Sequence, residues 1–158
     1  MIRIKITLKV NLKIWMIKME SKYKIIVSYI QDLSVEIPSP ESLLTIRNTI
    51  PEFQVKVDIN SKPLKKKMIE VLTTLSYTNP NKKKETGFFQ IKYATVVDIL
   101  DLKIKKDELE KIVLCDVQNE IYPDLKKALL NMLHDSGYNE IKFEKDINFD
   151  ELYNQRSN

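Results

Sequence analysis

Glycine is nearly absent from this chain, which contains only Gly87 and Gly137. Phosphate-binding loops of the Walker type and dinucleotide-binding turns both need several glycines, because backbone amides must approach the ligand closely. The scarcity of glycine therefore excludes these nucleotide-binding motifs, and no cofactor is expected.

Cysteine and histidine occur once each, as Cys115 and His134. A lone cysteine cannot form an internal disulfide, so a reducing cytoplasm is the simplest compartment to expect. One histidine and one cysteine are too few for an all-protein zinc site, so no metal site is expected. Cys115 is interpreted as a packing residue, and His134 and Asp135 point about 100° apart on a helix. No catalytic residue is expected, and the protein is not expected to be an enzyme.

Long apolar runs are absent too. Within the first 19 residues, positions 2–14 alternate between aliphatic and basic or polar side chains, so the segment resembles neither a signal peptide nor a membrane-spanning segment. This alternation is typical of a strand with one apolar and one basic face. Met16 and Met19 offer alternative starts, so the segment is equally well interpreted as an upstream extension. We therefore treat residues 1–20 as an N-terminal extension whose status is open, and residues 21–158 as a single domain.

Much of the net charge of +4 is local to two lysine clusters, Lys65–Lys67 and Lys82–Lys84. Such clusters can bind phosphate, which leaves a basic nucleic-acid-binding module as one hypothesis. Arginine, which grips phosphates and bases with two parallel hydrogen bonds, is nearly absent. Solvated loop charge is therefore the favoured interpretation, and no specific nucleic-acid partner is expected.

Four segments alternate between apolar and polar residues and are predicted to be β-strands. They comprise residues 23–37, 53–60, 67–77 and 87–99. On the first strand, Asp32 and Glu36 share one face, opposite the face that carries Tyr29 and Leu33. The fourth strand is apolar on both faces, which predicts that something packs on each of them.

Helical spacing of apolar residues follows the fourth strand. Asp107 and Glu110 have capping-box spacing and indicate the start of a helix. Tyr122-Pro123 interrupts the pattern, and Pro123 fits the first turn of a resumed helix that ends at Gly137. The sequence therefore predicts one long, broken helix.

A short terminal helix is predicted after Asn148, which has capping-box spacing with Glu151. Residues 41–52 form a crossover that follows Pro40 and is closed by Pro51, and it is too apolar for an ordinary surface loop. Strands, a broken long helix and a terminal helix, with apolar surface left over, indicate a protein that assembles and binds rather than one that catalyses a reaction.

Four motifs carry a family resemblance. Val27–Pro38 has the pattern aromatic-x-x-Asp-apolar-Ser-apolar-Glu-x-Pro, and three further motifs follow in order: Phe88–Ala94 (FFQIKYA), Ile121–Lys126 (IYPDLK) and Ile147–Tyr153 (INFDELY). Together they resemble the first strand, the fourth strand, the aromatic-Pro helix segment and the terminal signature of the SecB family of export chaperones.

The resemblance covers roughly residues 23–156 and implies an α+β fold. In that fold, a four-stranded antiparallel sheet carries a long broken helix and a short C-terminal helix packed on one face. The resemblance also implies a homo-oligomer, a dimer of dimers. The implied function is that of an ATP-independent holdase, which binds unfolded or nascent polypeptides such as preproteins for Sec-dependent export and hands them to the SecA motor.

The resemblance also assigns roles to individual residues. The carboxylates presented to SecA correspond to Asp32 and Glu36. The strand face used in oligomer contacts corresponds to Phe89, Ile91 and Tyr93. Position alone makes three crossover residues candidates for lining the client groove: Leu43, Leu44 and Ile46.

The chain departs from the family in its charge. Familiar members are acidic whereas this chain is basic, and Gln90 stands where a third partner-facing carboxylate is expected. Two alternatives to export therefore stay open. One is a SecB-like chaperone that protects an antitoxin or a phage-encoded client without SecA docking, and the other is the nucleic-acid-binding module.

Overall fold

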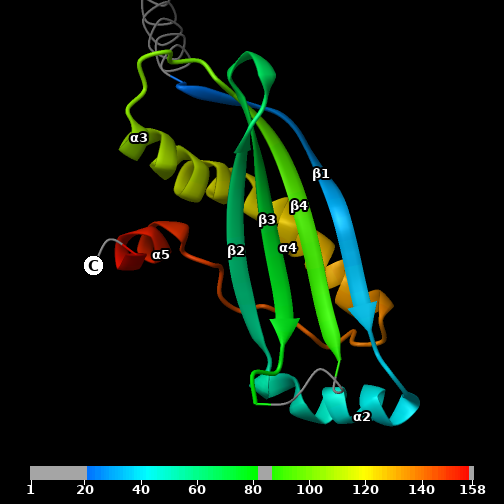
Figure 1. The fold of residues 1–158 in the computed structure, drawn as a ribbon. Coiled ribbons are helices and arrows are strands. Elements are labelled where there is room, and N and C mark those ends of the chain that lie inside the picture. Colours follow the sequence, from blue (N-terminus) through cyan, green and yellow to red (C-terminus); the bar gives the residue numbers. More distant parts are fainter. Residues whose placement is uncertain (1–20, 82–86, 157–158) are drawn as a thin grey trace, which may run out of the picture.

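The computed structural model describes residues 21–81 and 87–156, which form a four-stranded antiparallel sheet with helices on one face and at one end (Figure 1). The strands are β1 (Tyr23–Glu36), β2 (Gln54–Pro63), β3 (Met68–Thr78) and β4 (Phe88–Ile99). Their order across the sheet is β1-β4-β3-β2, so β1 and β2 are its two edges. The predicted α+β fold is confirmed. The predictions for residues 1–20 lie outside the described residues.

The helices are α2 (Pro40–Thr49), α3 (Lys106–Lys111), α4 (Val117–Asp135) and α5 (Phe149–Arg156). A short 3-10 turn, Ile50–Glu52, follows α2, and a π-helical turn, Ile112–Asp116, joins α3 to α4. Figure 1 shows α2 lying across one end of the sheet and α4 crossing one of its faces. Within the described ranges, no helix combines the length and the apolar composition needed to cross a bilayer.

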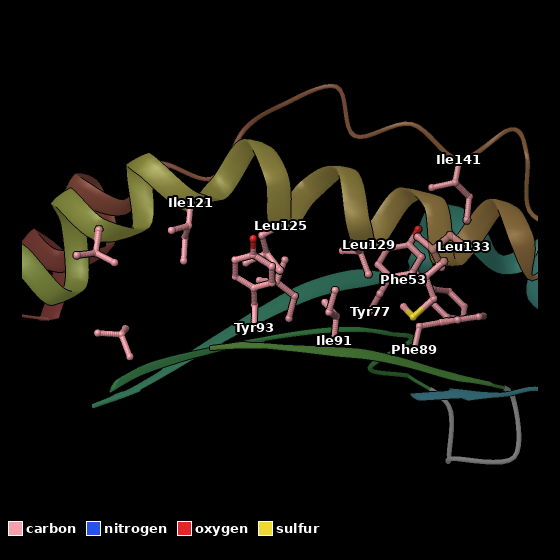
Figure 2. Close-up of a cluster of buried hydrophobic side chains, with 14 of the residues drawn as sticks. Phe53, Tyr77, Phe89, Ile91, Tyr93, Ile121, Leu125, Leu129, Leu133 and Ile141 are labelled. Carbon is pink, nitrogen blue, oxygen red and sulfur yellow. The ribbon is translucent and has the colours of Figure 1, made fainter. Parts of the chain in front are cut away.

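The core lies between α4 and one face of the sheet. Alternate residues of β3 and β4 point toward α4, which presents Leu125, Leu129 and Leu133 at helical spacing (Figure 2). These leucines are at most 1% exposed, and Phe89 and Ile91 beneath them are 0% exposed. Because the described residues place no element on the opposite face, burial of the sheet is one-sided.

The long helix changes its geometry at the π-helical turn and not at the predicted Tyr122-Pro123 break. Pro123 lies inside α4. At the π-helical turn, the side-chain amide of Gln118 donates a hydrogen bond to the carbonyl oxygen of Val113 (3.0 Å) and accepts one from the hydroxyl of Thr73 (2.8 Å). Gln118 and Thr73 are both fully buried. The pair ties the π-helical turn to β3, which fixes where α3 and α4 meet the sheet.

The predicted helix ends are correct in two of three places. The backbone N–H of Glu151 donates to the side-chain oxygen of Asn148 (3.0 Å), which confirms the cap of the terminal helix. Gly137 follows α4 with a φ of +98°, as expected of a residue that ends a helix. The cap at Asp107 was wrong, because Asp107 lies within the first turn of α3 and no side chain caps that helix. The apolar crossover is helix α2, whose first turn is capped by the hydroxyl of Ser39.

Candidate functional site

Cys115 and His134, the two residues considered as catalytic candidates, both have structural roles. Cys115 is fully buried, and burial raises the pKa of its thiol, which disfavours the thiolate that a nucleophile requires. The ring Nε2 of His134 lies 3.0 Å from the carbonyl oxygen of Ile141 and anchors the loop after α4. Within the part of the chain that the structure describes, no group of histidine, cysteine, aspartate and glutamate residues could hold a metal ion.

A continuous groove runs along the helix-facing side of β2. Three adjoining cavities of about 410, 250 and 440 Å3 make it up. The first and second share Ile59 and Leu114, and the second and third share Val57 and Leu152. Because neighbouring cavities share walls, they form one trough, which we call the β2 groove.

The walls of the β2 groove combine apolar and polar side chains, and the apolar ones come mainly from three elements. Alternate residues Val55, Val57 and Ile59 of edge strand β2 line one side, and Leu114 of the π-helical turn and Leu152 of α5 line the other. Charged side chains also line it: Asp58, Lys106, Glu110, Asp146 and Glu151. A trough of this kind suits an extended apolar segment, because burying one leucine-sized side chain stabilises a complex by about 1.5–3 kcal/mol.

The anchoring of α5 helps to leave this trough unfilled. Phe149, at the start of α5, is 1% exposed, and its ring centroid lies 5.5 Å from that of Tyr122. The side-chain amide of Asn119 on α4 donates to Asp150 (3.2 Å). These contacts fix the first turn of α5 beside α4, whereas Leu152 in its second turn stays 46% exposed.

The outer edge of β2 adds a second binding feature. Within the described sheet β2 pairs only with β3, so its other edge has backbone N–H and C=O groups without strand partners. An extended polypeptide can hydrogen-bond to such an edge while alternate side chains enter the adjoining groove. Backbone pairing of this kind depends little on the sequence of the guest.

The carboxylates Asp32 and Glu36 share the sheet face that points away from α4, as predicted. They lie opposite Lys92 and Phe88 of β4 in an uninterrupted register. The Asp32 carboxylate accepts a hydrogen bond from the hydroxyl of Ser34 (3.1 Å) and lies 3.8 Å from the ammonium group of Lys92. The strand thus presents two exposed carboxylates, and Lys92 partly neutralises the first.

The predicted face of Tyr29 was wrong. Two register shifts, between Ile25 and Val27 and between Ile30 and Asp32, interrupt the pairing of β1 with β4. The second shift inserts one residue between Tyr29 and Asp32, so Tyr29 lies on the same face as Asp32 and not on the opposite one.

The oligomer contact predicted for Phe89, Ile91 and Tyr93 was also wrong. The three side chains are 0%, 0% and 9% exposed, because α4 of the same chain covers them (Figure 2). Their register neighbours on β1 are the exposed ones: Val35, Leu33 and Ile30 are 38%, 46% and 47% exposed. The uncovered apolar surface on this side of the sheet is therefore on edge strand β1.

The three crossover residues proposed for the groove have different positions. Ile46 is 0% exposed and packs so closely against Gly87 that a side chain there would collide with it, so the prediction was wrong for Ile46. Leu43 packs against the core, and its carbonyl oxygen accepts a hydrogen bond from Tyr138 (3.4 Å). Leu44 is 57% exposed on α2, outside the β2 groove, and its role stays a prediction.

Comparisons with known proteins agree with this architecture. The family model described as preprotein translocase subunit SecB matches residues 17–158. A putative protein-export protein SecB from Pelagibacter ubique is 44% identical over 140 residues, which cover 89% of this chain and all of that protein. The protein-export protein SecB of Rickettsia akari is 27% identical over 129 residues, which cover 81% of this chain and 83% of that protein.

A solved structure shares the fold. It is a SecB-like chaperone from Mycobacterium tuberculosis in complex with a peptide from an antitoxin, and it superposes with a TM-score of 0.59 at 8% identity, covering 86% of this chain and 99% of that one. At that identity the match shows the fold alone. The family match and the 44% identity carry the assignment: this chain belongs to the SecB family.

Proposed function

We propose that the protein is an ATP-independent holdase that keeps unfolded or nascent preproteins extended in the β2 groove, in the cytoplasm, for Sec-dependent export. The observation that carries this proposal is the continuous groove, lined by alternate apolar residues of β2, beside the unpaired edge of that strand. Extended apolar segments are exposed in unfolded chains and buried in folded ones, so the groove selects non-native clients. Membership of the SecB family supports export as the purpose of the binding.

The subunit contact belongs on β1 in this proposal. Ile30, Leu33 and Val35 extend beyond the cover of α4 on an edge strand, and such a row of half-exposed apolar residues is costly in a lone subunit. A second copy that packs against this edge would cover it. The dimer of dimers implied by the family is the assembly that we expect.

Native mass spectrometry with and without an unfolded preprotein tests the proposal. We expect a homo-oligomer, tetrameric in the full assembly, that takes up the client at a fixed ratio in the absence of nucleotide. The variant Leu33→Lys, which places a charge in the proposed subunit contact, should shift the protein toward smaller species while the isolated subunit stays folded. A stable wild-type monomer that takes up no client would overturn the proposal.

Docking of SecA on the β1 carboxylates is a separate expectation. The double variant Asp32→Asn/Glu36→Gln should weaken SecA binding about three- to tenfold, because exposed charge pairs contribute modestly each. Binding of the wild type should also weaken as salt rises. Surface plasmon resonance with immobilised SecA measures both effects. Glu140→Gln is the control, since the Glu140 side chain is 78% exposed in the loop after α4 and lies 4.0 Å from Arg47. Equal affinity in the double variant and the control would exclude this docking site.

Neither alternative function gains support from the geometry. Lys65–Lys67 form the turn between β2 and β3, and Lys82–Lys84 lie outside the described residues, in the connection that leaves the far end of β3. Lys65–Lys67 therefore lie at the start of β3, and the connection with the second cluster begins at the opposite end of that strand. The antitoxin peptide belongs to the Mycobacterium protein, whose likeness to this chain is one of fold.

A further inference from the structure

Three segments converge at one end of the sheet, away from α2. They are the β2–β3 turn (Leu64–Lys67), the start of β1 and the loop after β4 (100–105) (Figure 1). The strand register pairs Met68 with Asp98, and the backbone N–H of Leu100 donates to the carbonyl oxygen of Lys22 (2.9 Å). The turn and the loop are therefore neighbours in space although Leu64 and Leu100 are 36 positions apart in the sequence.

Leucines are exposed on this end. Leu64, Leu100 and Leu102 are 36%, 50% and 69% exposed, and Leu102 has the largest value among the exposed large apolar residues of the described chain. The loop that carries Leu102 has a defined turn, because the backbone N–H of Lys103 donates to the Asp101 carboxylate (2.9 Å). Apolar side chains are thus held in solvent on an ordered turn.

Lysines surround these leucines. Six exposed ones lie on the same two segments and the adjoining first turn of α3: Lys65, Lys66, Lys67, Lys103, Lys105 and Lys106. None of the six forms an ion pair with a described residue. Four carboxylates also lie on or beside these segments: Asp98, Asp101, Asp107 and Glu108. Asp101 accepts a hydrogen bond from the backbone of its own turn, and Glu108 pairs with Lys22. This end therefore combines apolar tips with more lysines than carboxylates.

The combination of exposed leucines and lysines favours a lipid surface over a nucleic acid as the partner. Nucleic-acid surfaces are read by guanidinium groups and stacked aromatic rings, and this end has no arginine and no exposed aromatic ring within the described residues. Aliphatic side chains bury no apolar surface against a phosphate backbone. They do bury it when they enter the boundary between lipid headgroups and acyl chains, where neighbouring lysines contact anionic headgroups.

We propose that this leucine–lysine end docks reversibly on a membrane surface that carries anionic phospholipids. The cavity of the β2 groove that includes Lys106 opens at the same end. Docking would therefore hold that end of the groove close to the membrane. The proposal does not depend on which client fills the groove.

Sedimentation of the full chain with vesicles tests the proposal. The wild type should bind vesicles of phosphatidylglycerol and phosphatidylcholine, and bind phosphatidylcholine vesicles weakly. Leu100→Ser/Leu102→Ser should weaken binding at least about tenfold. Lys65→Gln/Lys66→Asn/Lys67→Asn should also weaken it and reduce its salt dependence. Leu44→Ser/Lys142→Gln, which makes comparable exposed changes elsewhere, should bind like the wild type.

All these variants keep residues 1–20, so any contribution of that segment is common to them. Circular dichroism should show the same fold in each. Two results would overturn the proposal. One is unchanged vesicle binding in the leucine variant. The other is tighter binding to a DNA or RNA oligonucleotide than to anionic vesicles, lost in the lysine variant but not in the leucine variant.

Discussion

Replacing Leu152 with lysine should weaken binding of an unfolded preprotein about 10- to 100-fold, because about 1.5–3 kcal/mol of apolar burial is lost and each 1.4 kcal/mol is a factor of ten. Leu152 lines two of the three cavities of the β2 groove and is already 46% exposed, so the charge should not disturb the fold. Fluorescence titration with a labelled, unfolded preprotein measures the effect.

Leu44→Lys is the matched control for this variant. Leu44 is 57% exposed on α2, outside the β2 groove, and its replacement should change client affinity by less than about twofold. The same pair of variants separates the β2 groove from the α2 position that the sequence suggested. A strong loss in Leu44→Lys, with Leu152→Lys unaffected, would move the binding site to α2.

Phe89→Ala should lower the free energy of unfolding by about 3–5 kcal/mol, the usual effect of removing a buried phenylalanine. Phe89 is 0% exposed, and its ring lies 5.6 Å from Tyr138 and 6.4 Å from both Phe53 and Tyr77, measured between ring centroids. Urea denaturation followed by circular dichroism measures the loss.

The neighbouring variant Phe88→Ala provides the comparison. Phe88 is half-buried on the sheet face that no described element covers, so its replacement should cost about 1 kcal/mol. The loss in Phe89→Ala should be the same at all protein concentrations, because α4 of the same chain forms the contact. A subunit with unchanged stability but weakened self-association would restore Phe89 to the oligomer interface.

The sequence predicts most of this fold because the strands alternate between apolar and polar residues, although β4 is apolar on both faces and β1 does not alternate regularly. The alternation of β3 and β4 matches the faces seen in the structure, and the terminal cap at Asn148 was a local signal. The π-helical turn and the two register shifts in β1 were not predicted. Each adds a residue to a regular element without a distinctive residue type, and tertiary contacts such as Gln118 with Thr73 decide where it falls.

The site predictions were also correct where a local pattern decides the outcome and wrong where tertiary contacts decide it. Asp32 and Glu36 were placed on one face correctly because no register shift lies between them. The role of Phe89 and Ile91 was wrong because alternation shows that a face is buried but not which element covers it. The β2 groove was missed because it is a gap between β2, the π-helical turn and α5, and a gap leaves no pattern in any one segment. The apolar alternation of β2 was its only local sign.

Photo-cross-linking of a bound preprotein tests the central claim most directly. A photoreactive phenylalanine analogue would replace Val57 in the β2 groove and, in separate variants, Leu44 on α2 and Val96 on the face that points away from α4. We expect the unfolded preprotein to cross-link strongly from position 57, without nucleotide, and weakly from positions 44 and 96. Strong cross-links from position 96 or 44, with none from position 57, would contradict the account.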